Sequence, residues 1–181
     1  MKIVSIVGMA GAGKSEAARF FTGRGFARIR FGDVTDEEIK KRGLALNEAN
    51  ERRVREELRR ELGMAAYAHL NLPKIDAAAR VSPVVIDGMY SWEEYRLLKE
   101  HFGGAFFVVA IVSAPALRYE RLARRVIRPL TAAEAAARDR SEIENLNKGG
   151  PIAMADATIL NEASLASMES ALEEVLQRLK I

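Results

Sequence analysis

The sequence predicts a single α/β domain with a mostly parallel sheet. Apolar strand patterns alternate with helical patterns along most of the chain, and this alternation is typical of a parallel sheet covered by helices. The first strand pattern, residues 2–7, leads directly into a glycine-rich segment, and a helix pattern follows over 14–23. A chain of 181 residues is long enough for one domain with a sizeable core.

Composition narrows the class of protein. Hydrophobic residues make up 49% of the chain and charged residues 29%, which indicates a globular protein rather than a disordered one. The absence of cysteine excludes disulfides, a thiolate zinc site and a cysteine nucleophile, and it suits a reducing compartment. No apolar run is long enough to span a membrane. A net charge of +3 is too small to indicate nucleic acid. We expect a cytoplasmic protein without membrane or nucleic-acid partners.

The first half of the chain contains one further strand pattern and a long helical stretch. Residues 26–31 alternate apolar and polar side chains, which predicts a second strand that ends at Gly32 and Asp33. A helical pattern then extends to about residue 80, with expected breaks at Gly43, Gly63 and Pro73. Asn47 is the expected N-cap of a helix that ends near Leu62. That helix is rich in arginine. Its interleaved glutamates predict surface ion pairs for most of these arginines, and we expect one or two arginines to face a phosphate instead.

The second half repeats the alternation. We expect strands at 83–88, 105–112 and 157–160. Ser91 begins a capping-box pattern for a helix to about residue 101, and Thr131 and Ser164 are expected caps of later helices. A helix predicted from Pro115 through Arg125 is interrupted near Pro129.

Residues 8–15 match the pattern G-x-x-x-x-G-K-S/T between a strand and a helix. Its glycines allow backbone N–H groups to converge on phosphate oxygens, and the helix N-terminus adds positive potential. Lys14 is expected to reach the β- and γ-phosphates of ATP, and Ser15 to hold Mg²⁺. The alternative is an ordinary glycine turn. The expected nucleotide contacts are Gly8, Gly11, Ala12, Gly13, Lys14, Ser15 and Glu16.

Two aspartates follow predicted strands at the edge where ligands bind in open α/β sheets. Asp87 ends the third strand and is expected to hold Mg²⁺ beside Ser15, unless it only shapes the turn at Gly88. Asp33 follows the second strand. It is expected to accept the proton of an attacking hydroxyl or to orient the acceptor, and the alternative role is an N-cap.

Arginines cluster around the interrupted helix. Phosphoryl transfer places negative charge on the moving group, which arginines stabilise, and a broken helix is typical of a mobile lid. The alternative is a basic surface patch. The arginines concerned are Arg121, Arg124, Arg125 and Arg128, followed by Arg138 and Arg140.

The chain resembles the P-loop nucleotide kinases, and within them adenylate-kinase-related and dephospho-CoA-kinase-like proteins. The segments that carry the resemblance appear in the family's order over nearly the whole chain: 6–14, 31–34, 40–44, 85–88, 93–94, 118–122, 138–140, 155–157 and 161–164. The resemblance implies a five-stranded parallel sheet of order 2-3-1-4-5, an acceptor region at 34–80 and a lid segment at 126–148.

The resemblance also implies roles for individual residues. Asp33 matches an acidic position near the acceptor hydroxyl of dephospho-CoA kinases, and Arg121 and Arg125 match arginines that lead into the lid. Asn161 matches a loop that packs near the donor adenine. Tyr90 and Ser91 stand where adenylate kinases have an arginine for the acceptor phosphate.

The function expected from the sequence is transfer of the γ-phosphoryl group of ATP, with Mg²⁺, to a nucleotide-like small molecule. A nucleoside monophosphate and dephospho-CoA both remain open as acceptors. The alternative is a nucleotide-binding regulatory switch, but a guanine-reading N-K-x-D motif is absent: Asn147-Lys148 is followed by two glycines. We expect a monomer or a homodimer.

Overall fold

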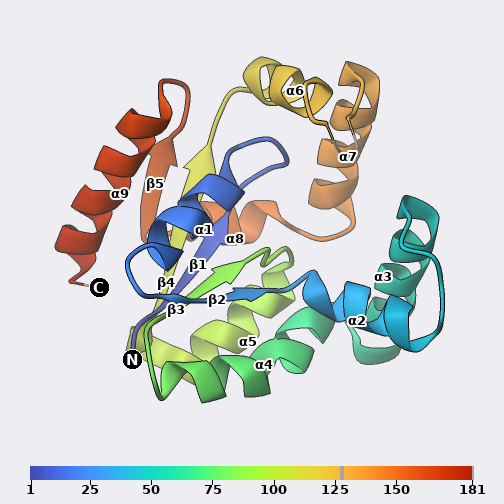
Figure 1. Ribbon diagram of the computed structural model, residues 1–181, viewed down its shortest axis with the longest axis horizontal. Helices are drawn as coiled ribbons and strands as arrows, with labels where there is room; N and C mark the ends of the chain where they lie inside the picture. Colours follow the sequence, from blue (N-terminus) through green and yellow to red (C-terminus); the bar gives the residue numbers. More distant parts are fainter. Residues whose placement is uncertain (127–128, 181) are drawn as a thin grey trace.

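The computed structural model describes residues 1–126 and 129–180. In this part of the chain five parallel strands form one sheet in the order β2-β3-β1-β4-β5, which confirms the predicted order (Figure 1). The strands are β1 Ile3–Val7, β2 Ala27–Arg30, β3 Val84–Asp87, β4 Phe106–Val112 and β5 Ala157–Leu160. Both Ile6 of β1 and Arg30 of β2 pair with Asp87, so β3 holds its last residue between two neighbours.

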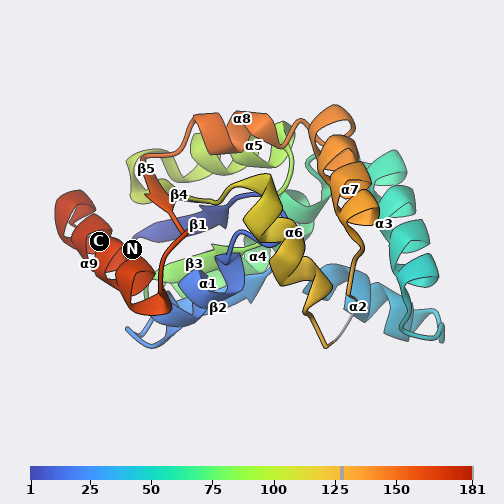
Figure 2. The same ribbon diagram turned by 90° about the horizontal axis from the view of Figure 1, so that it is seen from above.

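Helices cover both faces of the sheet (Figures 1 and 2). One face is covered by α1 Lys14–Thr22 and α9 Leu165–Leu179; the other is covered by α4 Ala66–Ala79, α5 Trp92–Phe102 and the short α8 Gly149–Ala153. A single 3-10 turn, η1 Gly103–Ala105, connects α5 to β4.

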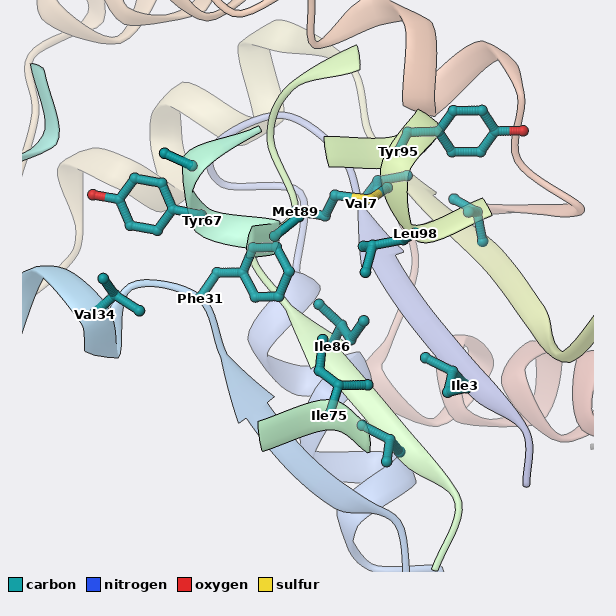
Figure 3. Packing of buried hydrophobic residues seen from close by; sticks show 14 of the residues in the cluster. Ile3, Val7, Phe31, Val34, Tyr67, Ile75, Ile86, Met89, Tyr95 and Leu98 are labelled. Carbon is teal, nitrogen blue, oxygen red and sulfur yellow. The ribbon is translucent and has the colours of Figure 1, made fainter. Parts of the chain in front are cut away.

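Alternate residues of the strands enter two separate cores. Ile3 and Val7 of β1 pack beneath α4 and α5, whereas Val4 and Ile6 pack beneath α1 and α9. Figure 3 shows the first of these cores, in which Ile86 of β3 lies between Phe31 and Ile75. Because both of their faces are buried, the central strands β1, β3 and β4 read as nearly continuous apolar runs, whereas side chains of the edge strands β2 and β5 alternate in exposure.

The remaining helices lie beyond the carboxyl ends of the strands (Figure 1). After β2 come α2 Asp33–Lys41 and α3 Glu48–Leu62; after β4 come α6 Pro115–Ala123 and α7 Ala132–Glu144. Two groups of helices therefore stand at the edge of the sheet where β1 runs into the glycine-rich segment. No helix in the described ranges is both long enough and apolar enough to cross a membrane.

Local signals placed most helix ends correctly. Asn47 caps α3, Ser91 and Thr131 form complete capping boxes with Glu94 and Glu134, and Ser164 caps α9. The expected break at Pro73 is wrong, because α4 continues through it. The proline is exposed, whereas Ile75 and other neighbours are buried, so packing holds the helix despite the missing N–H donor. Helix α6 ends at Ala123 rather than Arg125, and α8 was not predicted.

Candidate active site

The phosphate loop, residues 8–15, follows β1 and owes its path to three glycines. Gly8, Gly11 and Gly13 all have positive φ. A Cβ on Gly8 would lie 2.2 Å from the backbone oxygen of Ile111, and a Cβ on Gly11 would lie 2.6 Å from that of Arg118. Only glycine combines this conformation with so close an approach of other backbone segments. The loop is therefore set firmly against β4 and α6.

Side chains from distant segments hold the loop from behind. Asn161, which follows β5, donates from Nδ2 to the carbonyl oxygen of Ala12 at 2.9 Å. Arg118 of α6 donates from Nη1 to the carbonyl oxygen of Ala10 at 2.9 Å. Both side chains are buried. The structure thus places Asn161 against the phosphate loop; its expected proximity to the donor adenine stays a prediction.

Lys14 is held within the loop. Its Nζ donates to the carbonyl oxygen of Met9 at 2.9 Å. Burial, and then the charge of Lys148, lower the pKa of the Lys14 ammonium to about 7, while Glu142 acts in the opposite direction. A lysine in such surroundings gains most from an anionic ligand, because phosphate oxygens restore its preference for the charged form.

The two expected Mg²⁺ ligands offer oxygen atoms, which suit this ion. Ser15 is exposed in the first turn of α1, next to Lys14. Asp87 is nearly buried at the end of β3, and its carboxylate accepts a hydrogen bond from Nη2 of Arg28. In the described ranges no group of three His, Cys, Asp or Glu side chains is placed to hold a metal. A hydroxyl and a carboxylate oxygen are donors that Mg²⁺ accepts, and the roles of Ser15 and Asp87 as its ligands stay predictions.

Asp33 begins α2 directly beyond the end of β2. The N-cap of this helix is Gly32, so the N-cap role weighed for Asp33 is wrong. Its half-exposed carboxylate accepts a hydrogen bond from Nη1 of Arg30 at 2.8 Å, and the same atom donates to Asp36. The carboxylate is accessible beside the strand end that precedes it.

The expected arginines occupy different surroundings. Arg121 donates from Nη1 to Ser113 and from Nη2 to the carbonyl oxygen of Asn161, so it braces the loop after β5. Arg125 is exposed after α6, and burial of part of its side chain and then the charge of Arg138 lower its pKa. Arg128 lies outside the described residues.

A buried ionic cluster beside Lys14 was not expected from the sequence. Lys148 is 1% exposed, and its Nζ lies 2.6 Å from Oε2 of Glu142. Arg138 donates to the other carboxylate oxygen of Glu142 at 3.0 Å. Burial opposes ionisation of Glu142, but Lys148 and Arg138 lower its pKa to about 2. The sequence offered one signal, a lysine six residues after a glutamate, but such pairs are common on exposed surfaces.

The segment expected to bind the acceptor, residues 34–80, also contains polar groups in contact with one another. Thr35 of α2 and Tyr67 of α4 share a hydrogen bond of 2.5 Å between their hydroxyl oxygens. The guanidinium of Arg59, on α3, lies 4.9 Å from the centroid of the Tyr67 ring. Among the described residues, Nε of Arg59 has no hydrogen-bond partner.

Comparison with known proteins identifies the family of this chain. A family model described as an AAA domain matches residues 4–146. A protein of Thermococcus gammatolerans described as a UPF0200 protein is 37% identical over 185 residues, which cover 98% of this chain and 95% of the relative. The chain belongs to the AAA domain family and to the UPF0200 family.

Solved structures place this UPF0200 chain among the P-loop kinase folds. TT1252 from Thermus thermophilus superposes with a TM-score of 0.68 at 18% identity, covering 98% of this chain and 97% of that one. A shikimate kinase from Acinetobacter baumannii, solved in complex with shikimate, gives 0.64 at 18% identity, with 99% and 94% coverage. At this level of identity the likeness concerns the fold, which agrees with the expected P-loop kinase class.

Proposed function

We propose that the chain is a kinase that transfers the γ-phosphoryl group of ATP, with Mg²⁺, to a nucleotide-like small molecule. The acceptor would be a nucleoside monophosphate or dephospho-CoA. The observation that carries the proposal is the position of the phosphate loop between two groups of helices at one edge of the sheet (Figure 2). One group would bind the acceptor through residues 34–80, and the other would close over the donor through the lid segment, residues 126–148.

The chain's own groups account for the steps of such a transfer. Backbone N–H groups of the phosphate loop and the Lys14 ammonium would bind the donor phosphates. Ser15 and Asp87 would hold Mg²⁺, which neutralises charge on the phosphate oxygens when bound. Arg125 would stabilise charge on the moving phosphoryl group. Arg121 would support the loop that begins at Asn161, which is expected to lie near the donor nucleotide. Asp33 would orient the acceptor or take up its proton.

An acceptor panel tests the proposal. The full chain is incubated with Mg²⁺, ATP or GTP, and AMP, CMP, UMP or dephospho-CoA, and phosphorylated product is measured by chromatography. We expect the protein to phosphorylate one of these acceptors. Lys14→Ala should abolish this turnover and leave the thermal unfolding temperature unchanged. Lys180→Ala, at an exposed lysine that follows α9, is the matched control and should keep full activity. Slow ATP hydrolysis without product from any acceptor would favour the regulatory switch instead.

A further inference from the structure

The segment after β3 folds back beside the end of β2. Gly88 has a φ of +102°, and a Cβ on it would lie 3.3 Å from Cε2 of Tyr90 and 3.9 Å from Cβ of Phe31. The backbone N–H of Phe31 also donates to the carbonyl oxygen of Asp87 at 3.0 Å. Asp33 follows Phe31 by two residues. Asp33 and Tyr90 therefore extend from adjoining strand ends.

Tyr90 also faces the helices on the other side of the phosphate loop. Nζ of Lys148 lies 4.2 Å from the centroid of the Tyr90 ring. Burial and the charge of Arg138 lower the pKa of Arg125, whereas the interaction with Tyr90 raises it. The half-buried Tyr90 ring therefore contacts Lys148 on the donor side and Gly88 on the side of the β2 and β3 strand ends.

The backbone donors of this segment and the ammonium over the Tyr90 ring are already engaged by carboxylates. The backbone N–H of Tyr90 and that of Ser91 both donate to Oε2 of Glu94, at 2.7 and 3.2 Å. The ammonium over its ring is ion-paired with Glu142. A phosphate at this position would find two backbone N–H groups and one ammonium that are already bound to carboxylates. Its own negative charge would also lie beside those carboxylates, which is unfavourable.

The cations of the two strand ends are engaged in the same way. Arg30 binds Asp33 and Asp36, and Arg28 binds Asp87. Residues 88–91 contain no arginine or lysine. A neutral group is easier to place here than a second phosphate, because it needs no compensating charge.

We propose that the acceptor presents a hydroxyl group, rather than a phosphate, to the γ-phosphoryl group of ATP, and that Asp33 and Tyr90 line its position. The inference rests on the proposed function and decides between its two classes of acceptor. The hydroxyl oxygen forms a bond to the γ-phosphorus as the bond from that phosphorus to the β-phosphate oxygen breaks. The electron pair of the broken bond leaves with ADP, and the hydroxyl proton passes to the Asp33 carboxylate.

A second feature indicates that the acceptor carries an anionic group away from this hydroxyl. Arg59 is half-buried, and its Nε lacks a hydrogen-bond partner among the described residues. Its guanidinium stacks on Tyr67, whose hydroxyl binds Thr35, two residues from Asp33. A guanidinium in such surroundings pairs well with a carboxylate or a phosphate. The acceptor is therefore a nucleotide-like molecule that carries a free hydroxyl group and, away from it, an anionic group.

A comparison of acceptors tests the class. The full chain with ATP and Mg²⁺ is assayed with hydroxyl acceptors (dephospho-CoA, shikimate and gluconate) and with phosphate acceptors (AMP, CMP and UMP). We expect kcat/KM for one hydroxyl acceptor to exceed that of every monophosphate by about 100-fold or more. A preferred monophosphate would overturn the inference and leave the kinase intact. A preference for shikimate or gluconate would support the hydroxyl acceptor and overturn the nucleotide-like class of the proposed function. Failure of every acceptor would overturn the proposed function and this inference with it.

The role of Tyr90 is tested with variants, which are assayed with the preferred hydroxyl acceptor. Tyr90→Phe should raise the KM of the acceptor about 10-fold and leave the KM of ATP within about 2-fold, because one hydrogen bond to the acceptor is lost. Tyr95→Phe removes the same group from α5 and should change neither value; Figure 3 shows its oxygen pointing away from the core. Equal kinetics of Tyr90→Phe and the unaltered protein would remove Tyr90 from the site.

The carboxylate and the guanidinium have separate readouts. Asp33→Asn should lower kcat about 100-fold or more, with ATP affinity unchanged by direct titration. Arg59→Ala should raise the acceptor KM at least about 10-fold, whereas the exposed neighbour Arg60→Ala should not. An Asp33→Asn variant with full kcat, or Arg59→Ala with an unchanged KM, would contradict the corresponding assignment.

Discussion

Arg118 of α6 and Asp139 of α7 form a two-pronged ion pair, with Nη1 3.0 Å from Oδ1 and Nη2 2.6 Å from Oδ2. Tyr119 donates its hydroxyl hydrogen to the same carboxylate at 3.1 Å. Because Nη1 of Arg118 also donates to the carbonyl oxygen of Ala10, this pair connects α7 to the phosphate loop. The resemblance included both residues among its segments but assigned no role to them.

Breaking this pair is expected to be costly. Asp139→Ala leaves a buried arginine without its partner, and such a loss typically costs about 3 kcal/mol or more of unfolding free energy. Urea unfolding measures the change. Asp36→Ala, which removes one partner of the exposed Arg30, is the control and should cost about 1 kcal/mol or less. Similar losses in the two variants would contradict a structural role for the Arg118–Asp139 pair.

ATP binding is expected to take up a proton at Lys14. Burial and Lys148 hold the pKa of Lys14 at about 7, so at pH 8 the amine is mostly neutral. Donor phosphates favour the charged form, which raises this pKa and draws up to about one proton from the buffer. Calorimetry in buffers of different ionisation enthalpy should show uptake at pH 8 and far less at pH 6. Lys14→Arg should bind without uptake at pH 8, since guanidinium is charged throughout.

Glu94 is expected to make stability depend on pH. Burial raises the pKa of its carboxyl to about 7, above the value of about 4.5 in the unfolded chain. The folded state therefore holds an extra proton between pH 4.5 and pH 7, and stability is lost as the pH rises through this window. The whole effect is at most roughly 3 kcal/mol.

Glu94→Gln isolates this contribution. Glutamine also serves at the third position of a capping box, so it keeps the acceptor for the N–H groups of Tyr90 and Ser91 without titrating. Urea unfolding of both proteins at pH 5 and pH 8 should show the variant gaining relative to the unaltered protein at the higher pH. A constant difference between the proteins at both pH values would rule out titration of Glu94 in this window.

Gly8 is expected to tolerate no side chain. Alanine there would adopt an unfavourable φ of +140° and bring its Cβ within 2.2 Å of the backbone oxygen of Ile111 in β4. A central strand cannot withdraw easily, so we expect Gly8→Ala to cost at least about 2 kcal/mol and to weaken ATP binding. Gly104→Ala, where a Cβ meets nothing within 4 Å, should change thermal unfolding and ATP binding little. A Gly8→Ala protein that matched this control would refute the tight packing of the loop.

Local patterns predicted what depends on near neighbours in the chain. Ser91 and Glu94, or Thr131 and Glu134, are three residues apart, so each capping box is complete within one turn of helix. Pro73 misled the prediction, because its effect depends on how strongly the rest of α4 packs. The two aspartates at strand ends were expected from the rule that parallel strands present their carboxyl ends at one edge.

Contacts between distant segments could not be predicted in this way. Nothing local distinguishes Arg118, which is buried against Ala10, from Arg124, which is exposed on the same stretch. Lys148 resembles a surface lysine in sequence, yet it is 1% exposed between Glu142 and Tyr90. Such assignments depend on which helices meet, and that depends on the packing of both cores.

The sequence by itself determined the phosphate loop, the α/β class and the capped helices, because backbone conformation and apolar periodicity act over a few residues. The resemblance supplied the strand order, which the structure then confirmed. Which charges are paired depended on the tertiary fold. Arg28 pairs with Asp87 and Arg24 with Glu173, 59 and 149 residues apart in the chain. A charge interacts strongly only with its neighbours in space, and folding brings such neighbours together from distant parts of the chain.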